Sequence, residues 1–514
     1  MTSTASVADA KPVRSAGQKL LSFGERHPWI LFVLSLIWLP AAIDDARSMR
    51  LWLDEIVTLY LSRMSPGNLV DALRHGVDLQ PPFFYWVTRG FESLFGYSEL
   101  GVRSQAIFFF TAFTLILFQF VRAKLGTWYG WAAIWLALNT LAFGYSTAGY
   151  SSDGRPYAML IAFASLSLLC CSLYWANPRL WTLIAIAFSV AATVSTHYYG
   201  IFAILPLLAG EAFRWHQLRR FDLRLPVAIA VGLTPLIFLV PIARSGVSSH
   251  PPNPWNPVTI SSLGSVWGVL LSSRIPVPFF LSLAIVFFAW RRFCEDVPWK
   301  AFRLSPDVIA GVSFLAIPIP AVIVAKLGAN MIFFRYLLPV VIGLVVLCIL
   351  TLYRVARASR ELALLVSLGC IVWFLYTWVP HYHLHFPAQP GRLSIPAPDD
   401  ALPIIIASSG DHALYFHYGA SSLRARLFIV TDAEVSSRYP GQADVALTMM
   451  HTAPYFSFHT IDFRGLVERR EFYVWEVNGA SGSGWLIPEL LGRGAHVDVA
   501  HADQAAILYR VHLP

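Results

Sequence analysis

Charged residues are scarce in this sequence. They make up only 13% of its 514 residues, whereas soluble domains carry about 25%. Hydrophobic residues make up 56% and gather in long runs that are almost free of charge. Each run is about 17–25 residues long, which is enough to cross a hydrocarbon core of roughly 30 Å as a helix. The composition therefore excludes a soluble protein and predicts a polytopic α-helical membrane protein in contact with membrane lipid.

Lysine is also scarce, and nearly all basic residues are arginines. The net charge of +8 could suggest binding to nucleic acid, but no basic stripe with interleaved aromatic residues is present. The arginines lie instead in short loops between the apolar runs, as the positive-inside rule requires of cytoplasmic loops. We therefore expect no nucleic-acid partner.

Cysteine is rare, and no metal-ligand spacing such as Cys-x-x-Cys occurs. The five cysteines lie in apolar runs or in one basic loop, and none follows Cys370. Extracytoplasmic disulfides are therefore not expected. Most histidines fall in the C-terminal tail. They are scattered there, so we interpret them as surface or core residues rather than as a metal site.

Eleven apolar runs are interpreted as membrane spans. They cover roughly 28–44, 99–121, 128–147, 156–175, 179–196, 199–214, 225–243, 273–290, 307–326, 332–351 and 361–379. Basic clusters follow every second span, which predicts a cytoplasmic N-terminus. An odd number of spans then places the C-terminus outside. The eighth span is the least regular, because Arg274, Pro276 and Pro278 crowd its start.

These spans divide the chain into three parts. We expect a cytoplasmic segment at 1–27, a transmembrane catalytic domain at 28–379 and an extracytoplasmic α/β accessory domain at 380–514. The first extracytoplasmic loop, 44–98, is aromatic and amphipathic. Its apolar residues recur at helical spacing, which predicts short interfacial helices at 54–64 and 68–75. Pro81-Pro82 is expected to break the chain again.

The C-terminal tail begins with a proline-rich linker and continues with short apolar runs. Strands are predicted at 404–406, 414–418, 427–430 and 472–477, with a helix near 488–491. No acid-base constellation stands out in the tail. We therefore expect that it shapes the acceptor side and that Asp411, His412 and His417 are not essential.

Ionisable residues near the membrane are the first candidates for function. They gather at the outer ends of spans and in the first loop, where topology places all of them on one side: Asp54, Glu55, Arg103, Asp153, Arg155, His197 and Arg335. Arginine binds phosphate through two parallel hydrogen bonds, and a carboxylate can take a proton from an attacking hydroxyl. The pattern predicts one polar pocket that accepts a lipid-phosphate-sugar, with Arg155 and Arg335 on the phosphate.

Six sequence elements within residues 28–350 stand in an order that resembles a known family. They are WLDEIVTLY (52–60), QPPFFYW (80–86), FGYSELGVR (95–103), SSDGRPYAM (151–159), THYYG (196–200) and FFRYLLPV (333–340). They resemble the bacterial branch of the dolichyl-phosphate-mannose protein mannosyltransferases, in the GT-C superfamily, to which the aminoarabinose lipid A transferases are related. The resemblance implies a glycosyltransferase of the bacterial inner membrane that uses a polyprenyl-phosphate-linked sugar donor. It also favours an uncleaved first helix over a signal peptide ending after Pro40-Ala41-Ala42.

The resemblance also implies roles for individual residues. Asp54 corresponds to the catalytic base, and Glu55 is expected to support it. Substrate-binding roles are expected for Gln80, Arg103, Asp153, Arg155, Tyr157, His197, Tyr198, Arg335 and Tyr336. The acceptor varies among such enzymes and can be a lipid, a glycan or a protein. Some relatives hold a divalent metal ion near the first-loop acid, so such an ion is possible here, and no other cofactor is expected.

This sequence departs from the family pattern at two positions. Gln80 stands where His is common, and Asp153-Gly154-Arg155 stands where Glu-x-Arg is common. Both replacements are polar, so activity is expected to survive them, whereas the choice of substrate can differ.

Structural roles are open for the same residues. Asp54 could cap the first interfacial helix, and Arg103 could pair with Glu99 one helical turn away. Arg155 and Arg335 could be interface anchors, and Gln80-Pro81-Pro82 only a helix breaker. A lipid or sugar transporter, a flippase, a polysaccharide polymerase or ligase, and a non-catalytic assembly subunit are the alternative functions. Transporters usually bind at mid-membrane between internal repeats, which this sequence does not display.

Overall fold

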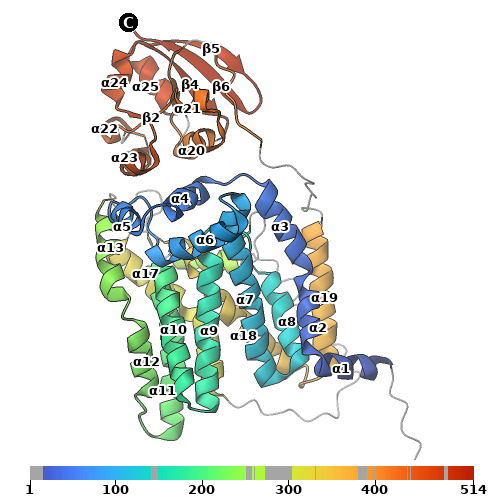
Figure 1. Ribbon diagram of the computed structural model, residues 1–514. Helices are drawn as coiled ribbons and strands as arrows, with labels where there is room; N and C mark the ends of the chain where they lie inside the picture. The colour runs from blue at the N-terminus through green and yellow to red at the C-terminus, as the bar shows by residue number, and fades with distance from the viewer. Residues whose placement is uncertain are drawn as a thin grey trace, which may run out of the picture.

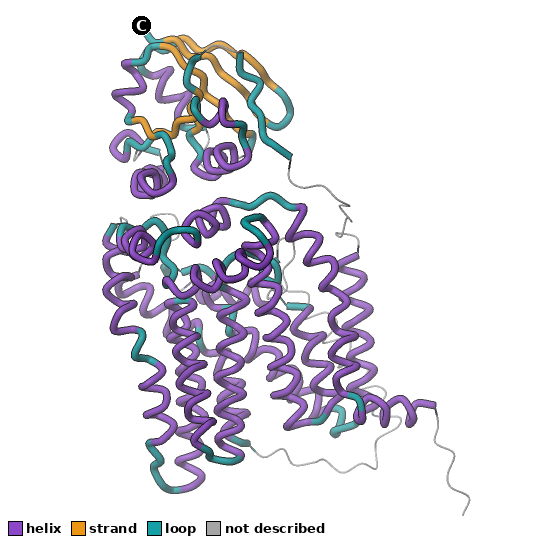
Figure 2. The backbone as a smooth tube through the Cα atoms, in the orientation of Figure 1, coloured by secondary structure: helices purple, strands orange, loops and turns teal. Residues whose placement is uncertain are grey.

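The computed structural model describes residues 16–140, 149–249, 258–259, 261–271, 304–329, 332–379, 391–398, 401–436, 438–439, 442–479 and 484–514. A bundle of long helices forms one part, and a sheet with short helices forms the other (Figure 1). All strands of the described residues belong to the C-terminal part (Figure 2). The protein is therefore a helical membrane protein with a C-terminal sheet, as the composition predicted.

The bundle contains several helices that are long and apolar enough to cross a membrane. Four such segments occur in the described residues, at Pro28–Ser48, Glu99–Leu125 (α7), Tyr157–Ala176 (α9) and Arg360–Trp378 (α19). Shorter apolar helices are α10 (Leu180–Thr196) and α18 (Val340–Val355). The other helices of the bundle are α1 (Ala16–Arg26), α8 (Thr127–Leu138), α11 (Ile204–Leu218), α12 (Arg224–Gly232), α13 (Leu236–Ser248), α14 (Ser261–Leu271), α16 (Pro306–Ser313) and α17 (Pro318–Val324). The eighth expected span, 273–290, lies outside the described residues, so the total of eleven stays a prediction.

Two expected spans are bent instead of straight. The helices within 224–248 meet at 44°, and those within 306–327 meet at 45°. Pro235 is the N-cap of α13 and Pro318 is the first residue of α17. Proline has no backbone N–H and its ring clashes with the preceding turn, so each proline ends one helix and begins the next.

Three short helices lie between the bundle and the sheet (Figure 1). They are α4 (Leu53–Ser62), α5 (Pro66–Arg74) and α6 (Pro82–Phe95). The first two confirm the helices expected in the loop. The third was not predicted, although Pro82 stands at its first turn, where proline is well tolerated.

The C-terminal sheet has six strands in the order β3-β2-β1-β4-β6-β5. These are β1 (Ile404–Ile406), β2 (Leu427–Val430), β3 (Thr460–Ile461), β4 (Glu471–Val477), β5 (His496–Ala502) and β6 (Ala506–His512). The pairs among β3, β2, β1 and β4 are parallel, whereas β4–β6 and β5–β6 are antiparallel. The sheet is accompanied by α20 (Ser409–Tyr418), α21 (Ser421–Arg424), α22 (Ala433–Ser436), α23 (Gln442–Phe456), α24 (Phe463–Glu468) and α25 (Leu486–Gly492).

One predicted strand is wrong. Residues 414–418 are the second half of α20, because the Ser408 side chain caps that helix by accepting a hydrogen bond from the Asp411 backbone N–H. The strands at 404–406, 427–430 and 472–477 and the helix near 488–491 are confirmed.

The interfacial helices and the C-terminal part share one hydrophobic core. Tyr60 of α4 stacks on Phe456 at the end of α23, with ring centroids 5.0 Å apart. Phe458, also from the C-terminal part, meets the same ring at 6.5 Å. The C-terminal part is therefore packed against α4, the helix that carries Asp54.

Candidate active site

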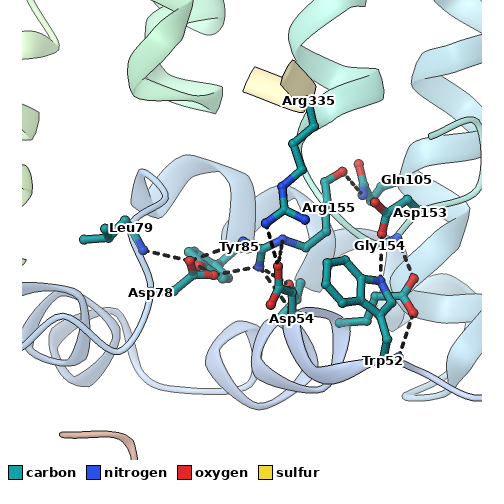
Figure 3. A network of polar contacts seen from close by, with 12 residues as sticks. Trp52, Asp54, Asp78, Leu79, Tyr85, Gln105, Asp153, Gly154, Arg155 and Arg335 are labelled. Atoms are coloured by element: carbon teal, nitrogen blue, oxygen red, sulfur yellow. Dashed lines mark hydrogen bonds and ion pairs between the residues drawn. The ribbon is translucent and has the colours of Figure 1, made fainter. Parts of the chain in front are cut away.

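The start of α4 is fixed by the side chain of Glu55. The N-cap residue is Trp52, and its backbone N–H donates to Glu55 Oε2 at 3.3 Å. Asp54 therefore does not cap the helix, which corrects one structural alternative, and its carboxylate is available for other contacts. Figure 3 shows Trp52 and Asp54 beside Arg155 and Arg335, two arginines from distant parts of the chain.

Glu55 and Arg103 form a buried ion pair. Arg103 Nε and Nη2 donate to the two Glu55 carboxylate oxygens at 2.8 and 2.6 Å. The remaining guanidinium hydrogen bonds go to the carbonyl oxygens of Ala46, Met49 and Arg50. The side chains are only 0% and 2% exposed, so this ion pair holds the start of α4 against α7. The expected roles of Glu55 in catalysis and Arg103 in binding stay predictions, whereas Arg103 pairs with Glu55 rather than with Glu99.

Asp54 lies between two cationic side chains. Its Oδ2 is 3.6 Å from Arg335 Nη2 and 3.9 Å from Arg155 Nε, and the side chain remains 27% exposed. Burial raises the pKa of the Asp54 carboxyl above its ordinary value, and the charges of Arg155 and Arg335 oppose this rise without cancelling it. Asp54 is thus a reachable carboxylate whose basicity exceeds that of an exposed aspartate.

Arg155 is held by a carboxylate that the sequence did not single out. Its Nη1 and Nη2 donate to the Asp78 carboxylate at 2.6 and 3.2 Å. Tyr85 donates to the same carboxylate at 2.6 Å. Burial works against ionisation, but the charge and hydrogen bonds of Arg155 outweigh it and lower the pKa of Asp78. Arg155 also donates to the Asp54 carbonyl and the Thr58 hydroxyl, so most of its donors are already used.

Arg335 is placed differently from the other two arginines. Four aromatic rings surround its guanidinium, with Cζ-to-centroid distances of 4.9 to 5.9 Å: Trp52, Tyr157, Phe333 and Tyr336. Such cation-π contacts hold an arginine without consuming its N–H donors. Among the described residues it donates no hydrogen bond, and its side chain is 24% exposed. Arg335 is therefore the arginine that can still bind an anion.

Asp153 supports Trp52 rather than facing the open site. The Trp52 indole N–H donates to Asp153 Oδ1 at 3.2 Å, and Asp153 is buried. Burial first, and the charge of Glu55 next, raise the pKa of Asp153. The next backbone N–H, of Gly154, donates to Glu55 at 2.8 Å. A Cβ at this glycine would lie 2.4 Å from Val102, which explains the glycine between Asp153 and Arg155.

A mostly apolar cavity of about 230 Å³ lies beside this polar group. Its lining includes Gln80, His197, Tyr198 and Tyr336. The His197 ring is 4.8 Å from that of Tyr336. Burial first, and the charge of Arg155 next, lower the pKa of His197 to about 3, so this imidazole is neutral. Gln80 Oε1 and His197 Nε2 are buried without a hydrogen-bond partner among the described residues.

Part of the chain matches a known protein family. Residues 79–243 match the profile of the dolichyl-phosphate-mannose-protein mannosyltransferase family. The chain is a membrane glycosyltransferase, and this segment is similar to that family. The predicted resemblance is therefore confirmed, and the transporter alternative is set aside. Asp54 and Arg335 lie outside the matched segment, so the roles proposed for them rest on the geometry of the site.

Two crystal structures resemble this glycosyltransferase over nearly its whole length. Both are of ArnT from Cupriavidus metallidurans, one bound to undecaprenyl phosphate and one in the apo state. Each is 14% identical in sequence, and the match covers 96% of this chain and 98% of the other. The TM-scores are 0.53 and 0.52, which is a similarity of fold. No curated protein matches the sequence.

A divalent metal ion does not fit the residues around Asp54. Within the described parts of the chain, no group of three or more His, Cys, Asp or Glu side chains could hold a metal ion. The nearest charged neighbours of the Asp54 carboxylate are Arg155 and Arg335. Two guanidinium groups repel a cation and attract an anion, so this charge pattern suits a phosphate better than a metal.

Proposed function

We propose that this glycosyltransferase moves a sugar from a polyprenyl-phosphate carrier to a hydroxyl of an extracytoplasmic lipid, glycan or protein. The observation that carries the proposal is the pair formed by Asp54 and Arg335, which are 3.6 Å apart. One is a reachable carboxylate with a raised pKa, and the other is a guanidinium with unused donors. Side by side, they meet the two needs of the reaction, a base for the acceptor and a partner for the departing phosphate.

The reaction is a single displacement. Asp54 accepts the proton of the acceptor hydroxyl as that oxygen forms a bond to the anomeric carbon. The bond from this carbon to the phosphate oxygen breaks, and its electron pair leaves with the polyprenyl phosphate. The nucleophile and the leaving group occupy opposite faces, so the anomeric configuration inverts. No glycosyl-enzyme intermediate is required, unlike in retaining hydrolases with two close carboxylates.

The donor would lie across the polar group and the apolar cavity. Arg335 would bind the phosphate, because its donors are unused, whereas Arg155 would orient Asp54 through its contacts with Asp78 and Thr58. The cavity next to Tyr336 and His197 suits the first isoprene units of the lipid. The undecaprenyl phosphate bound by the structurally similar ArnT supports a polyprenyl-phosphate carrier for this chain as well.

Substitutions of Arg335 test the phosphate site. We expect Arg335→Lys to keep the charge but weaken binding of undecaprenyl phosphate by about 10-fold or more, because lysine lacks the planar fork. Arg335→Gln should weaken it at least as much. Arg464→Lys is the matched control, because that side chain is 88% exposed in the C-terminal part. Normal binding by both Arg335 variants would place the phosphate elsewhere.

The two Arg335 variants should also differ in the pH dependence of sugar transfer. Asp54 acts as a base only when ionised, so transfer falls as the pH drops through its pKa. Arg335 lowers that pKa, so in Arg335→Gln activity should be lost at a higher pH than in the wild type. Arg335→Lys keeps the charge and should shift the acid limb less. The rate of sugar transfer measured from about pH 4 to pH 8 gives the acid limb of each variant.

The orientation in the membrane is part of the proposal. We propose a bacterial inner-membrane protein with a cytoplasmic N-terminus and an extracytoplasmic C-terminus. In support, α1 and the C-terminal sheet lie at opposite ends of the bundle (Figure 1). A reporter enzyme that is active only outside the cytoplasm, fused after Pro514, should be active. Activity from a cytoplasm-specific reporter at that position would reverse the orientation.

The reaction itself is best tested on whole cells first. Mass spectrometry of envelope lipids and glycans, with and without the gene, should reveal one glycan that loses a single sugar and a polyprenyl-phosphate sugar that accumulates. Expression of the Asp54→Asn variant in the deletion strain, at wild-type abundance, should restore neither the glycan nor the normal level of the polyprenyl-phosphate sugar. An unchanged envelope in the deletion strain would contradict the proposed transfer.

A further inference from the structure

The C-terminal part contacts the segment before Asp54 at two points: the Gly391 carbonyl accepts a hydrogen bond from Arg50 Nη2 at 3.2 Å, and Tyr418 contacts Leu51. Tyr418 is the last residue of α20 and is almost completely buried. Its hydroxyl accepts a hydrogen bond from the Leu51 backbone N–H at 2.9 Å and donates one to Glu99 Oε1 at 2.7 Å. One hydroxyl thus joins the sheet domain, the first loop and the start of α7.

The residues around Leu51 are held from several directions. Arg103 donates to the carbonyl oxygens of Met49 and Arg50, and Glu55 accepts from the backbone N–H of Trp52. These contacts come from the transmembrane domain and from the first loop itself. Tyr418 supplies the contact to the Leu51 N–H, three residues before Asp54. The direction and position of the first turn of α4 therefore depend on a residue of the C-terminal part.

We propose that Tyr418 is a positioning residue for the transfer reaction and that the C-terminal part belongs to the catalytic unit. It acts through the 51–54 segment, which sets where the Asp54 carboxylate stands relative to Arg335. This inference rests on the proposed base role of Asp54. It goes beyond a domain that only shapes the acceptor side, because Tyr418 acts on the segment that carries Asp54 and does not line the cavity proposed for the carrier.

A further tyrosine bridge between the two parts lies away from Leu51. Tyr455 of α23 donates to Asp71 Oδ2 at 2.6 Å and contacts His75 Nδ1 at 2.9 Å. Both partners belong to α5 or its end, and their side chains are 58% and 60% exposed. Tyr455 thus helps to dock the domain, but neither of these partners lies in the 51–54 segment. It is the matched control for Tyr418.

The decisive comparison is Tyr418→Phe against Tyr455→Phe, each in the full-length protein in lipid nanodiscs. Tyr418→Phe keeps the ring and removes only the hydroxyl. We expect its kcat for transfer to fall by roughly 10- to 100-fold, because small displacements of a catalytic group cost rates of that order. The dissociation constant for undecaprenyl phosphate should stay within about twofold. Tyr455→Phe should keep the wild-type kcat. Equal losses in both variants would mean that the effect is loosened docking, and the inference would fail.

A second measurement does not depend on the role of Asp54. Amide hydrogen exchange of the peptide containing Leu51 should accelerate in Tyr418→Phe and not in Tyr455→Phe, because the Leu51 N–H loses its acceptor. Unchanged exchange would overturn the positioning role whatever the base is. Faster exchange with wild-type kcat would show that the order of this segment does not matter for transfer. If instead Asp54→Asn is fully active, the proposed base is wrong, and the exchange result still reports on Tyr418.

Discussion

Replacement of Asp54 by Asn is expected to lower the rate of sugar transfer by about 10²–10⁴-fold, the usual range for loss of a general base. The amide has almost the same shape as the carboxylate but cannot accept the proton of the acceptor hydroxyl. The helix cap is unaffected, because Trp52 and Glu55 provide it. Single-turnover transfer from a radiolabelled polyprenyl-phosphate sugar measures this step directly.

Donor binding separates this result from general damage to the site. Asp54→Asn removes a negative charge beside Arg335, so undecaprenyl phosphate should bind at least as tightly as in the wild type. The fold should also keep its thermal stability, since the Asp54 side chain is partly exposed. Wild-type transfer rates, or a product that retains the anomeric configuration of the donor, would refute the assignment of the base.

Topology predicted that the site residues lie close together. It did not predict which arginine is bound by a carboxylate and which keeps unused donors. Asp54 was expected in the first outer loop and Arg155 and Arg335 at outer ends of spans, so alternation of the loops placed all three on one side. The sequence gives no sign that Arg155 is used by a carboxylate while Arg335 stays free. That difference arises from Asp78, a lone aspartate in a loop with no motif around it. Its only sequence signal is its position two residues before Gln80.

Polar residue types near a site do not reveal whether they touch a substrate. Glu55 stands next to Asp54 in the chain, but the helix turns it inward, where Arg103 meets it. The partner of Arg103 depends on how α7 packs against the first loop, and helical spacing alone suggested Glu99 instead. Tertiary packing therefore decided a contact that local spacing left open.

The C-terminal part was predicted only in outline, because local patterns marked some of its strands and not others. Continuous apolar runs marked β1, β2 and most of β4, because buried parallel strands are apolar on both faces. β5 was missed since most of its residues are exposed and no alternation is visible. The contact of Tyr418 with Leu51 spans 367 positions, and no local pattern in either segment predicts it.

Breaking the Glu55–Arg103 pair is expected to unfold the site rather than merely slow the chemistry. Glu55→Gln leaves the Arg103 guanidinium buried without a counter-charge, which costs about 3–5 kcal/mol in comparable buried pairs. Arg103→Gln likewise leaves the Glu55 carboxylate buried without a counter-charge. Both variants should show a marked loss of thermal stability in detergent together with loss of transfer. Asp54→Asn, by contrast, should lose transfer alone.

The double variant Glu55→Gln/Arg103→Gln decides between a structural and a catalytic role for the pair. It removes both charges together, so no ion is left buried and unpaired, and it should recover part of the stability that either single variant loses. If Glu55 only holds the start of α4, transfer should recover in step with stability. Full stability with transfer still at the level of Glu55→Gln would return Glu55 to the catalytic machinery. Stability losses that simply add would show that the 2.6 Å contact does not couple the two residues energetically.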